Sequence, residues 1–139
     1  MKLKDDIILN KISIIKNCLR RVKEEYEHFE NDIASNYTKQ DSIILNLQRA
    51  CEASIDLGTH IIKINDLAIP QSSRDVFIIL EKHKILNKNI SEKMQKMVGF
   101  RNIVIHDYQS IDISILRKIL DNHLIDFLDF IDSILEKDK

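Results

Sequence analysis

The chain has 139 residues, of which 44% are hydrophobic and 31% are charged, and its formal net charge is −1. It contains only 2 glycines and 1 proline, which excludes sandwiches, barrels and doubly wound sheets, because their many tight turns depend on these residues. The balanced charge excludes a globally basic nucleic-acid binder, so contact with nucleic acid requires a local basic patch. We therefore predict a soluble, all-α protein with a single domain spanning residues 1–139.

Helical periodicity runs along nearly the whole chain, because the aliphatic residues recur three and four positions apart rather than two. Five helical segments are predicted, separated by polar stretches. They run from about Asp5 to Asp32, Lys39 to Asn65, Ser73 to Lys84, Asn89 or Ser91 to His106, and Asp112 to Glu136. Because the third segment is short, the pattern predicts a four-helix up-down bundle with one short additional helix.

Side chains that can cap a helix precede three of these segments. Thr38 and Asp41, three residues apart, resemble a capping box at the start of the second segment. Ser72 or Ser73 can cap the third segment, and Asp112 can cap the fifth.

Cys18 and Cys51 lie far apart within helical patterns, so we expect both to be small, buried, reduced side chains of a protein in a reducing compartment. A disulfide between them is the less favoured alternative. Neither has neighbours at zinc spacing, and Glu24 to His28 is the only faint sign of a di-metal bundle, so no metal or cofactor is expected. The N-terminus lacks a secretory apolar run, and no segment has the length of a membrane span. A cytoplasmic protein without membrane contact is therefore predicted.

The fourth segment combines an apolar face with reactive side chains. Its apolar stripe consists of Met94, Met97, Val98, Val104 and Ile105. Arg101 falls in the middle of this stripe, and a buried arginine needs a partner, a cavity or an interface. His106 follows five residues later, about 140° around the helix. The two side chains can converge only if the helix ends near His106 or if a second chain completes the site.

Arginine and histidine together suit metal-free cleavage of RNA. A histidine can exchange the proton of the attacking 2′-hydroxyl near neutral pH, and an arginine can stabilise the charge on phosphorus. Tyr108 can position a phosphate or stack on a base. The alternative is a purely structural role, with His106 bound to a helix-end carbonyl and Arg101 in a salt bridge, and the spacing alone leaves both open.

Polar residues of the second segment are candidates to hold Arg101 in place. Asp56 and His60 share one helix face, and Glu52 lies on the same face and competes with Asp56. The alternative for Asp56 and His60 is an intrahelical pair of little energetic importance. The remaining histidines, including His123, are expected to be solvated.

The stretch RNIVIHDY, Arg101 to Tyr108, matches the R-x4-H-x-Y motif, and the chain resembles HepT-like proteins, a branch of the HEPN superfamily. RACEASIDLGTHII, Arg49 to Ile62, is similar to the second helix of that family. The likeness extends from about Leu3 to about Leu135. It implies a HEPN-like bundle that forms homodimers, with the motif of each chain near the interface.

The resemblance also implies a function. HepT-like proteins are RNase toxins of two-gene toxin–antitoxin systems, and a minimal nucleotidyltransferase antitoxin neutralises them by transferring AMP to the motif tyrosine, here Tyr108. Arg101 and His106 would be the catalytic pair of a metal-independent endoribonuclease acting on tRNA or mRNA. Asn102 would contact the phosphate, and Asp107 would orient a histidine. The alternative is a non-catalytic subunit that binds the nucleotidyltransferase and presents nucleotide substrate to it.

Overall fold

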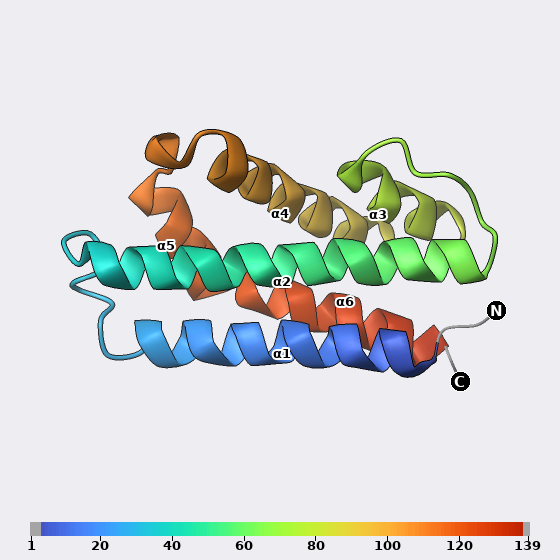
Figure 1. Ribbon diagram of the computed structural model, residues 1–139, viewed down its shortest axis with the longest axis horizontal. Coiled ribbons are helices and arrows are strands. Elements are labelled where there is room, and N and C mark those ends of the chain that lie inside the picture. Colours follow the sequence, from blue (N-terminus) through green and yellow to red (C-terminus); the bar gives the residue numbers. More distant parts are fainter. Residues whose placement is uncertain (1–3, 138–139) are drawn as a thin grey trace.

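The structure, a computed structural model, describes residues 4–137, and within them it contains only helices and turns (Figure 1). The helices are α1 (Asp6–Tyr26), α2 (Tyr37–Ile64), α3 (Ser73–Lys82), α4 (Lys88–His106), α5 (Ile113–Asn122) and α6 (Leu124–Lys137), with a short 3-10 turn η1 (Tyr108–Ser110) between α4 and α5. The predicted all-α class is confirmed.

The long helices α1, α2, α4 and α6 form the bundle. α1 and α2 lie side by side and run in opposite directions, and α6 packs against both α1 and α4 (Figure 1). The short α3 packs against α2 and α4. α4 therefore contacts three other helices, α2, α3 and α6.

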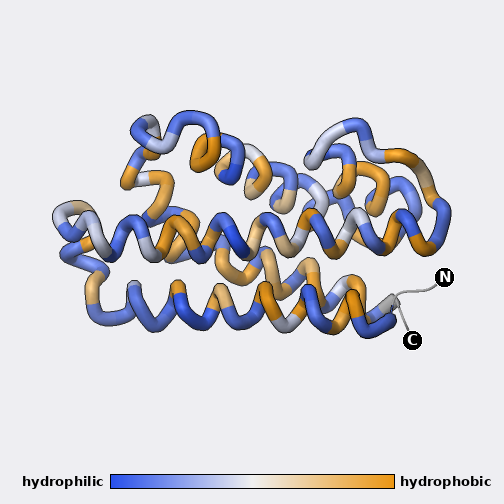
Figure 2. The backbone as a smooth tube through the Cα atoms, in the orientation of Figure 1, coloured by the Kyte–Doolittle hydropathy of each residue, from blue (hydrophilic) through white to orange (hydrophobic). Residues whose placement is uncertain are grey.

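The core follows the predicted helical periodicity, and apolar and polar bands alternate along each helix (Figure 2). The apolar residues of α1 that recur three and four positions apart are buried throughout, at Ile8, Ile12, Ile15, Leu19, Val22 and Tyr26. Phe77 of α3 and Phe130 of α6 meet edge to face, with 5.5 Å between the ring centroids. Both rings are fully buried, so they join α3 to the far side of the bundle.

A glycine sets the close approach of α3 to α2. A Cβ atom built on Gly58 would lie 2.5 Å from Cγ1 of Val76 and 3.2 Å from Cδ1 of Leu80. Val76 and Leu80 are both buried, so neither side chain has free space beside it. The absence of a side chain at position 58 is therefore what lets α3 pack at this distance.

The predicted capping box of α2 is wrong. Asn36 caps this helix, because its side chain accepts a hydrogen bond of 3.1 Å from the backbone N–H of Lys39. Asparagine caps at least as well as threonine, so the helix begins one residue before Thr38. Asp41 is thereby released from any role at the helix start. The caps predicted for α3 and α5, Ser72 and Asp112, are confirmed.

Two predicted helical segments differ from the structure. α1 stops at Tyr26 rather than near Asp32, and a series of turns then buries Ile33 completely, with its carbonyl accepting a hydrogen bond of 2.5 Å from Gln40 Nε2. The fifth segment is two helices, broken at His123. His123 was expected to be solvated, but its Nδ1 donates a hydrogen bond of 2.9 Å to the buried carboxylate of Asp126.

In α5 and near the end of α4, the buried residues also differ from those expected. In α5, Ile115 is 51% exposed, whereas the adjacent Leu116 is buried. On α4, Ile105 is 44% exposed although it was assigned to the stripe, and Phe100 is buried instead. The last turn of α4 therefore exposes aliphatic surface beside the motif.

Candidate active site

Arg101 extends from α4 toward the first turn of α3 and the middle of α2. Its Nη2 donates a hydrogen bond of 2.6 Å to the hydroxyl of Ser73, and its Nε lies 3.5 Å from Glu52 Oε1. Only 14% of the side chain is exposed. The buried Nε makes no hydrogen bond within the described residues, so Glu52 balances the charge by proximity alone. Three helices thus fix the guanidinium in place.

The expectation that Asp56 and His60 hold this arginine is corrected by these contacts. Asp56 Oδ2 lies 3.4 Å from Lys11 Nζ of α1, and His60 Nε2 shares a hydrogen bond of 2.7 Å with Asp5, the residue that caps α1. Both therefore tie α2 to α1 within one chain. The carboxylate that pairs with the arginine is Glu52, one helical turn earlier on the same face.

Arg101 and His106 both belong to α4, and the helix ends at His106 as predicted. The His106 side chain is exposed and makes no hydrogen bond or ion pair within residues 4–137. The Asp107 carboxylate accepts a hydrogen bond of 2.5 Å from Ser110 Oγ, so its expected role toward a histidine is not seen in the single chain. Asn102 is half-buried. The helix end leaves His106 available to a substrate.

Tyr108 lies in η1, and its hydroxyl donates a hydrogen bond to Asp41 Oδ1 on α2. The ring is 42% exposed, and Asp41 is exposed as well. Partial burial, followed by the hydrogen bond and negative charge of Asp41, raises the pKa of Tyr108 to about 12. The sequence offered no sign of this contact, because 67 positions separate the two residues.

Cys51 lies beside Glu52, behind the Arg101 site. It is 2% exposed, and its Sγ donates a weak hydrogen bond of 3.7 Å to the backbone oxygen of Met97. Burial raises the pKa of this thiol to about 12, although Arg101 acts in the opposite direction. Cys18 is also buried, and both cysteines are free, as predicted.

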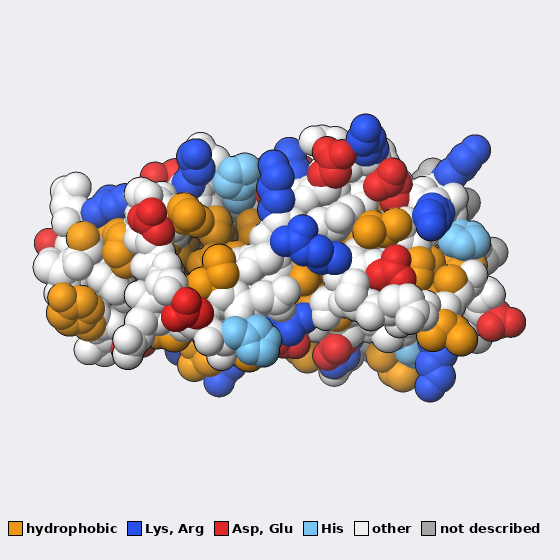
Figure 3. Space-filling model, turned by 90° about the horizontal axis from the view of Figure 1, so that it is seen from above, with side chains coloured by type: hydrophobic (Ala, Val, Ile, Leu, Met, Phe, Trp, Pro, Cys, Tyr) orange, Lys and Arg blue, Asp and Glu red, His pale blue; other side chains and the backbone are white. Residues whose placement is uncertain are grey.

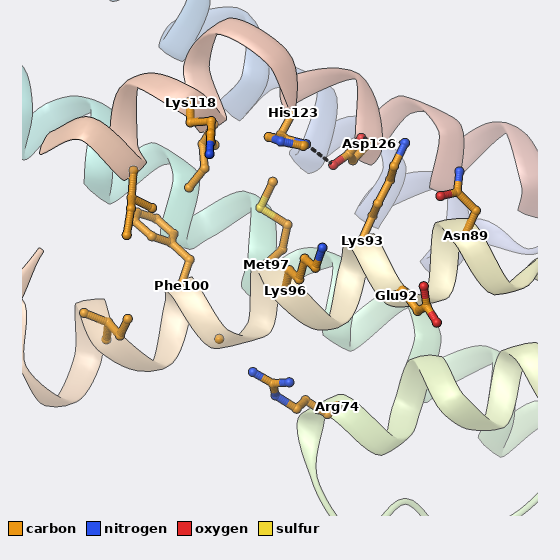
Figure 4. A pocket seen from close by; sticks show the side chains of 14 residues that line it. Arg74, Asn89, Glu92, Lys93, Lys96, Met97, Phe100, Lys118, His123 and Asp126 are labelled. Carbon is orange, nitrogen blue, oxygen red and sulfur yellow. Dashed lines mark hydrogen bonds and ion pairs between the residues drawn. The ribbon is translucent and has the colours of Figure 1, made fainter. Parts of the chain in front are cut away.

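A basic hollow lies on the other side of α4, between α4, the start of α3 and α5 (Figures 3 and 4). It encloses about 440 Å³. Its cationic side chains are Arg74, Lys93, Lys96 and Lys118, and its apolar lining includes Met97, Phe100, Ile103, Ile115 and Ile119. Lys93 lies 3.7 Å from the buried Asp126 carboxylate, whereas Arg74, Lys96 and Lys118 form no ion pair within the described chain. Glu92 and Asp126 also line the hollow, so its four cationic side chains exceed its carboxylates by two.

The described residues contain neither a metal-binding cluster nor a membrane-spanning helix. Residues 4–137 contain no group of three or more His, Cys, Asp or Glu side chains arranged to hold a metal ion. None of the helices in this range is long and apolar enough to cross a membrane.

The fold and the site together define a class: a helical bundle of the HEPN type, with arginine, histidine and tyrosine at the end of α4. The sequence profile of the family described as Ribonuclease HepT-like matches residues 15–134. The chain therefore belongs to this family of ribonucleases, which confirms the resemblance seen in the sequence.

Individual relatives agree with this assignment. The chain is 46% identical over 133 residues to the mRNA nuclease HepT of Shewanella oneidensis, covering 94% of this chain and 97% of that protein. It is 26% identical over 106 residues to the tRNA nuclease HepT of Aphanizomenon flos-aquae, covering 76% and 72% of the two chains. Its fold matches the tri-AMPylated HEPN toxin of S. oneidensis in complex with the MNT antitoxin, with a TM-score of 0.91, 44% identity, and coverage of 96% and 99%.

Proposed function

We propose that this protein is the toxin of a toxin–antitoxin pair and that it cleaves RNA with Arg101 and His106. The observation that carries the proposal is the state of the two side chains at the end of α4. Ser73 and Glu52 hold the guanidinium, while its Nη1 makes no hydrogen bond within residues 4–137 and remains available to a phosphate. His106 is exposed at the helix end, and the 46% identical relative is an mRNA nuclease.

The proposed reaction is transfer of the phosphodiester to the neighbouring ribose hydroxyl. The 2′-oxygen forms a bond to phosphorus, the bond from phosphorus to the 5′-oxygen breaks, and a cyclic phosphate results. His106 exchanges a proton with the attacking or leaving oxygen near neutral pH. Arg101 stabilises the additional negative charge on the phosphoryl oxygens, and its fixed position means that little reorganisation is needed.

The spacing of the two residues supports a homodimer. His106 lies about 140° from Arg101 around the helix axis, so one straight helix cannot direct both at one small group. Ile105 beside them is 44% exposed, and a second copy that packed against this part of α4 would cover it. In the dimer, residues of both copies would then surround one RNA strand.

The basic hollow is the proposed path of the RNA next to the cleaved bond. Arg74, Lys96 and Lys118 attract the phosphates, and the apolar lining accommodates a base. Ile103, which lines the hollow, lies three residues before His106 and hence one helical turn away. The hollow therefore lies about one helical turn from the proposed catalytic histidine.

Regulation would occur at Tyr108, as the acceptor of AMP from a nucleotidyltransferase antitoxin. The tri-AMPylated toxin in complex with MNT antitoxin is 44% identical to this chain. Tyr108 is 42% exposed and lies two residues after His106. An attached adenylyl group would place a bulky phosphodiester where the substrate phosphate binds, and so block cleavage by volume and by charge.

RNA cleavage by the purified protein tests the catalytic assignment. Arg101→Ala and His106→Ala should each lower the rate about 100-fold or more, because each removes one of the two catalytic effects. Matched controls are Arg20→Ala and His28→Ala, which replace exposed residues of the same types away from α4. If either active-site variant cleaved RNA at the parental rate, its catalytic role would be wrong.

The intact mass of the protein, produced with and without the nucleotidyltransferase, tests the regulatory assignment. We expect the mass of one or more adenylyl groups, mapped to Tyr108 and absent in Tyr108→Phe. A protein that binds the nucleotidyltransferase, but is not modified and does not cleave RNA, would instead be the non-catalytic subunit considered from the sequence.

A further inference from the structure

The hydrogen bond between Tyr108 and Asp41 joins the proposed AMP acceptor to a carboxylate of the same chain. Asp41 lies in the second turn of α2, and Tyr108 lies in the η1 turn after α4. Figure 1 shows the start of α2 and the turn after α4 at the same end of the molecule. The bond fixes the direction in which the hydroxyl points, since it is the only side-chain hydrogen bond of Tyr108 within the described residues.

A second tyrosine–aspartate pair in this chain shows what a structural contact of this kind looks like. Tyr26 donates a hydrogen bond of 2.8 Å to Asp121, and it is only 8% exposed. That pair joins α1 to α5 at the edge of the core. The pair at Tyr108 differs because both residues are exposed and the contact anchors only a three-residue turn. Its position suits a reaction with a bound partner better than support of the core.

Adenylylation requires the tyrosine oxygen to lose its proton. The raised pKa of Tyr108 means that the phenol is neutral at physiological pH, so the proton must leave during the reaction. A carboxylate that already accepts the hydroxyl hydrogen is in position to take it. The negative charge of such a base disfavours ionisation of the tyrosine in the resting protein. The same base assists loss of the proton once the bond to phosphorus begins to form.

We propose that Asp41 is a catalytic residue for the modification of its own chain, which orients the Tyr108 hydroxyl and accepts its proton. The inference rests on the proposed function, in which a nucleotidyltransferase supplies a nucleoside triphosphate. The tyrosine oxygen forms a bond to the α-phosphorus, the bond from that phosphorus to the β-phosphate oxygen breaks, and pyrophosphate leaves. The phenolic proton passes to the Asp41 carboxylate.

The product state follows from the same atoms. The esterified oxygen has no hydrogen to donate, so the contact with Asp41 is lost. The new phosphodiester is anionic, and protonation of Asp41 means that two negative charges do not meet at the moment of transfer.

The test is the initial rate of adenylylation of the full-length protein by its nucleotidyltransferase with ATP, followed by intact mass. Asp41→Asn retains an oxygen that accepts the hydroxyl hydrogen but cannot take the proton, so the rate should fall about 100-fold or more. Asp41→Ala should be at least as slow, and Asp41→Glu should recover part of the rate. Asp121→Asn is the matched control, and it should be modified at the parental rate at a temperature where it is folded.

The outcomes separate this inference from the proposed function. Modification of Asp41→Asn at the parental rate would overturn the role of Asp41 while leaving Tyr108 as the acceptor. A parent protein that takes up no adenylyl group from an active nucleotidyltransferase would overturn the regulatory proposal itself, and the role of Asp41 with it. Circular dichroism and thermal denaturation of Asp41→Asn distinguish a misfolded variant from a folded one that lacks the base.

Discussion

The hydroxyl of Ser73 accepts a hydrogen bond of 2.6 Å from Arg101 Nη2 and so connects the start of α3 to the motif on α4. The neighbouring Ser72 has a different task, because its hydroxyl accepts from the backbone N–H of Asp75 and caps α3. Adjacent serines at one helix start therefore separate support of the helix from support of the site.

Because the two serines have different roles, their alanine substitutions should affect different properties, one the activity and the other the stability. Ser73→Ala should lower kcat/KM for RNA about 10-fold, because a hydrogen bond to a charged group contributes about 1.5–3 kcal/mol to the position of Arg101. Ser72→Ala should instead lower the free energy of unfolding by about 1 kcal/mol, with kcat/KM unchanged. Cleavage kinetics and urea denaturation of both variants provide the measurement. Equal activity of Ser73→Ala and the parent would show that Ser73 does not position Arg101.

A second prediction concerns the carboxylate partner of Arg101. Glu52→Gln removes the charge 3.5 Å from Nε, so the guanidinium should lose orientation and the cleavage rate should fall several-fold. Asp56→Asn is the matched control, since its carboxylate lies 3.4 Å from Lys11 rather than near the arginine. The rates are compared at low and at high salt. A larger loss in Asp56→Asn than in Glu52→Gln would contradict the pairing seen here.

The helices could be predicted because their signal is local. Residues three and four apart share a face, and this holds for α1 whatever surrounds it. Boundaries were less accurate where several local signals compete, as at α2, where Asn36 rather than Thr38 is the cap. The break at His123 was missed because the apolar pattern continues through it, and only the buried Asp126 explains the position of the histidine.

The candidate site could be proposed from the sequence where its residues share one motif. Arg101, His106 and Tyr108 come from this motif at the end of α4 and in η1, and the need of a buried arginine for a carboxylate was recognised. The choice of Glu52 could not be derived, because it depends on how far α2 is displaced along α4, which no sequence pattern specifies. The contact of Asp41 with Tyr108 depends on the packing of segments 67 positions apart.

Alkaline stability provides a third prediction, through Cys51. Burial raises the pKa of its thiol from 9.0 to about 12 in the folded protein, so between these pH values the unfolded chain loses a proton that the folded chain keeps. The contribution of this group is thus fully present below pH 9 and falls as pH rises, by about 1.4 kcal/mol per pH unit within that window. Urea denaturation from pH 8 to 11 should show a shallower loss in Cys51→Ala. Parallel curves for the two proteins would mean that the thiol ionises equally in both states.

The two glycines of the chain provide a last prediction, because their surroundings differ. A methyl group at Gly58 would lie 2.5 Å from the buried Val76, so Gly58→Ala should force α3 away from α2 and cost about 1–3 kcal/mol of unfolding free energy. At Gly99 the near atom is Nη2 of Arg74, at 2.7 Å, on a flexible side chain that can move. Gly99→Ala should therefore keep or raise stability, by up to about 1 kcal/mol from helix propensity. Because Arg74 lines the basic hollow, the same substitution should raise KM for RNA. Thermal denaturation of both variants measures the two stability effects, and cleavage kinetics of Gly99→Ala measure the effect on KM. A Gly58→Ala protein as stable as the parent would show that α3 can repack at no cost.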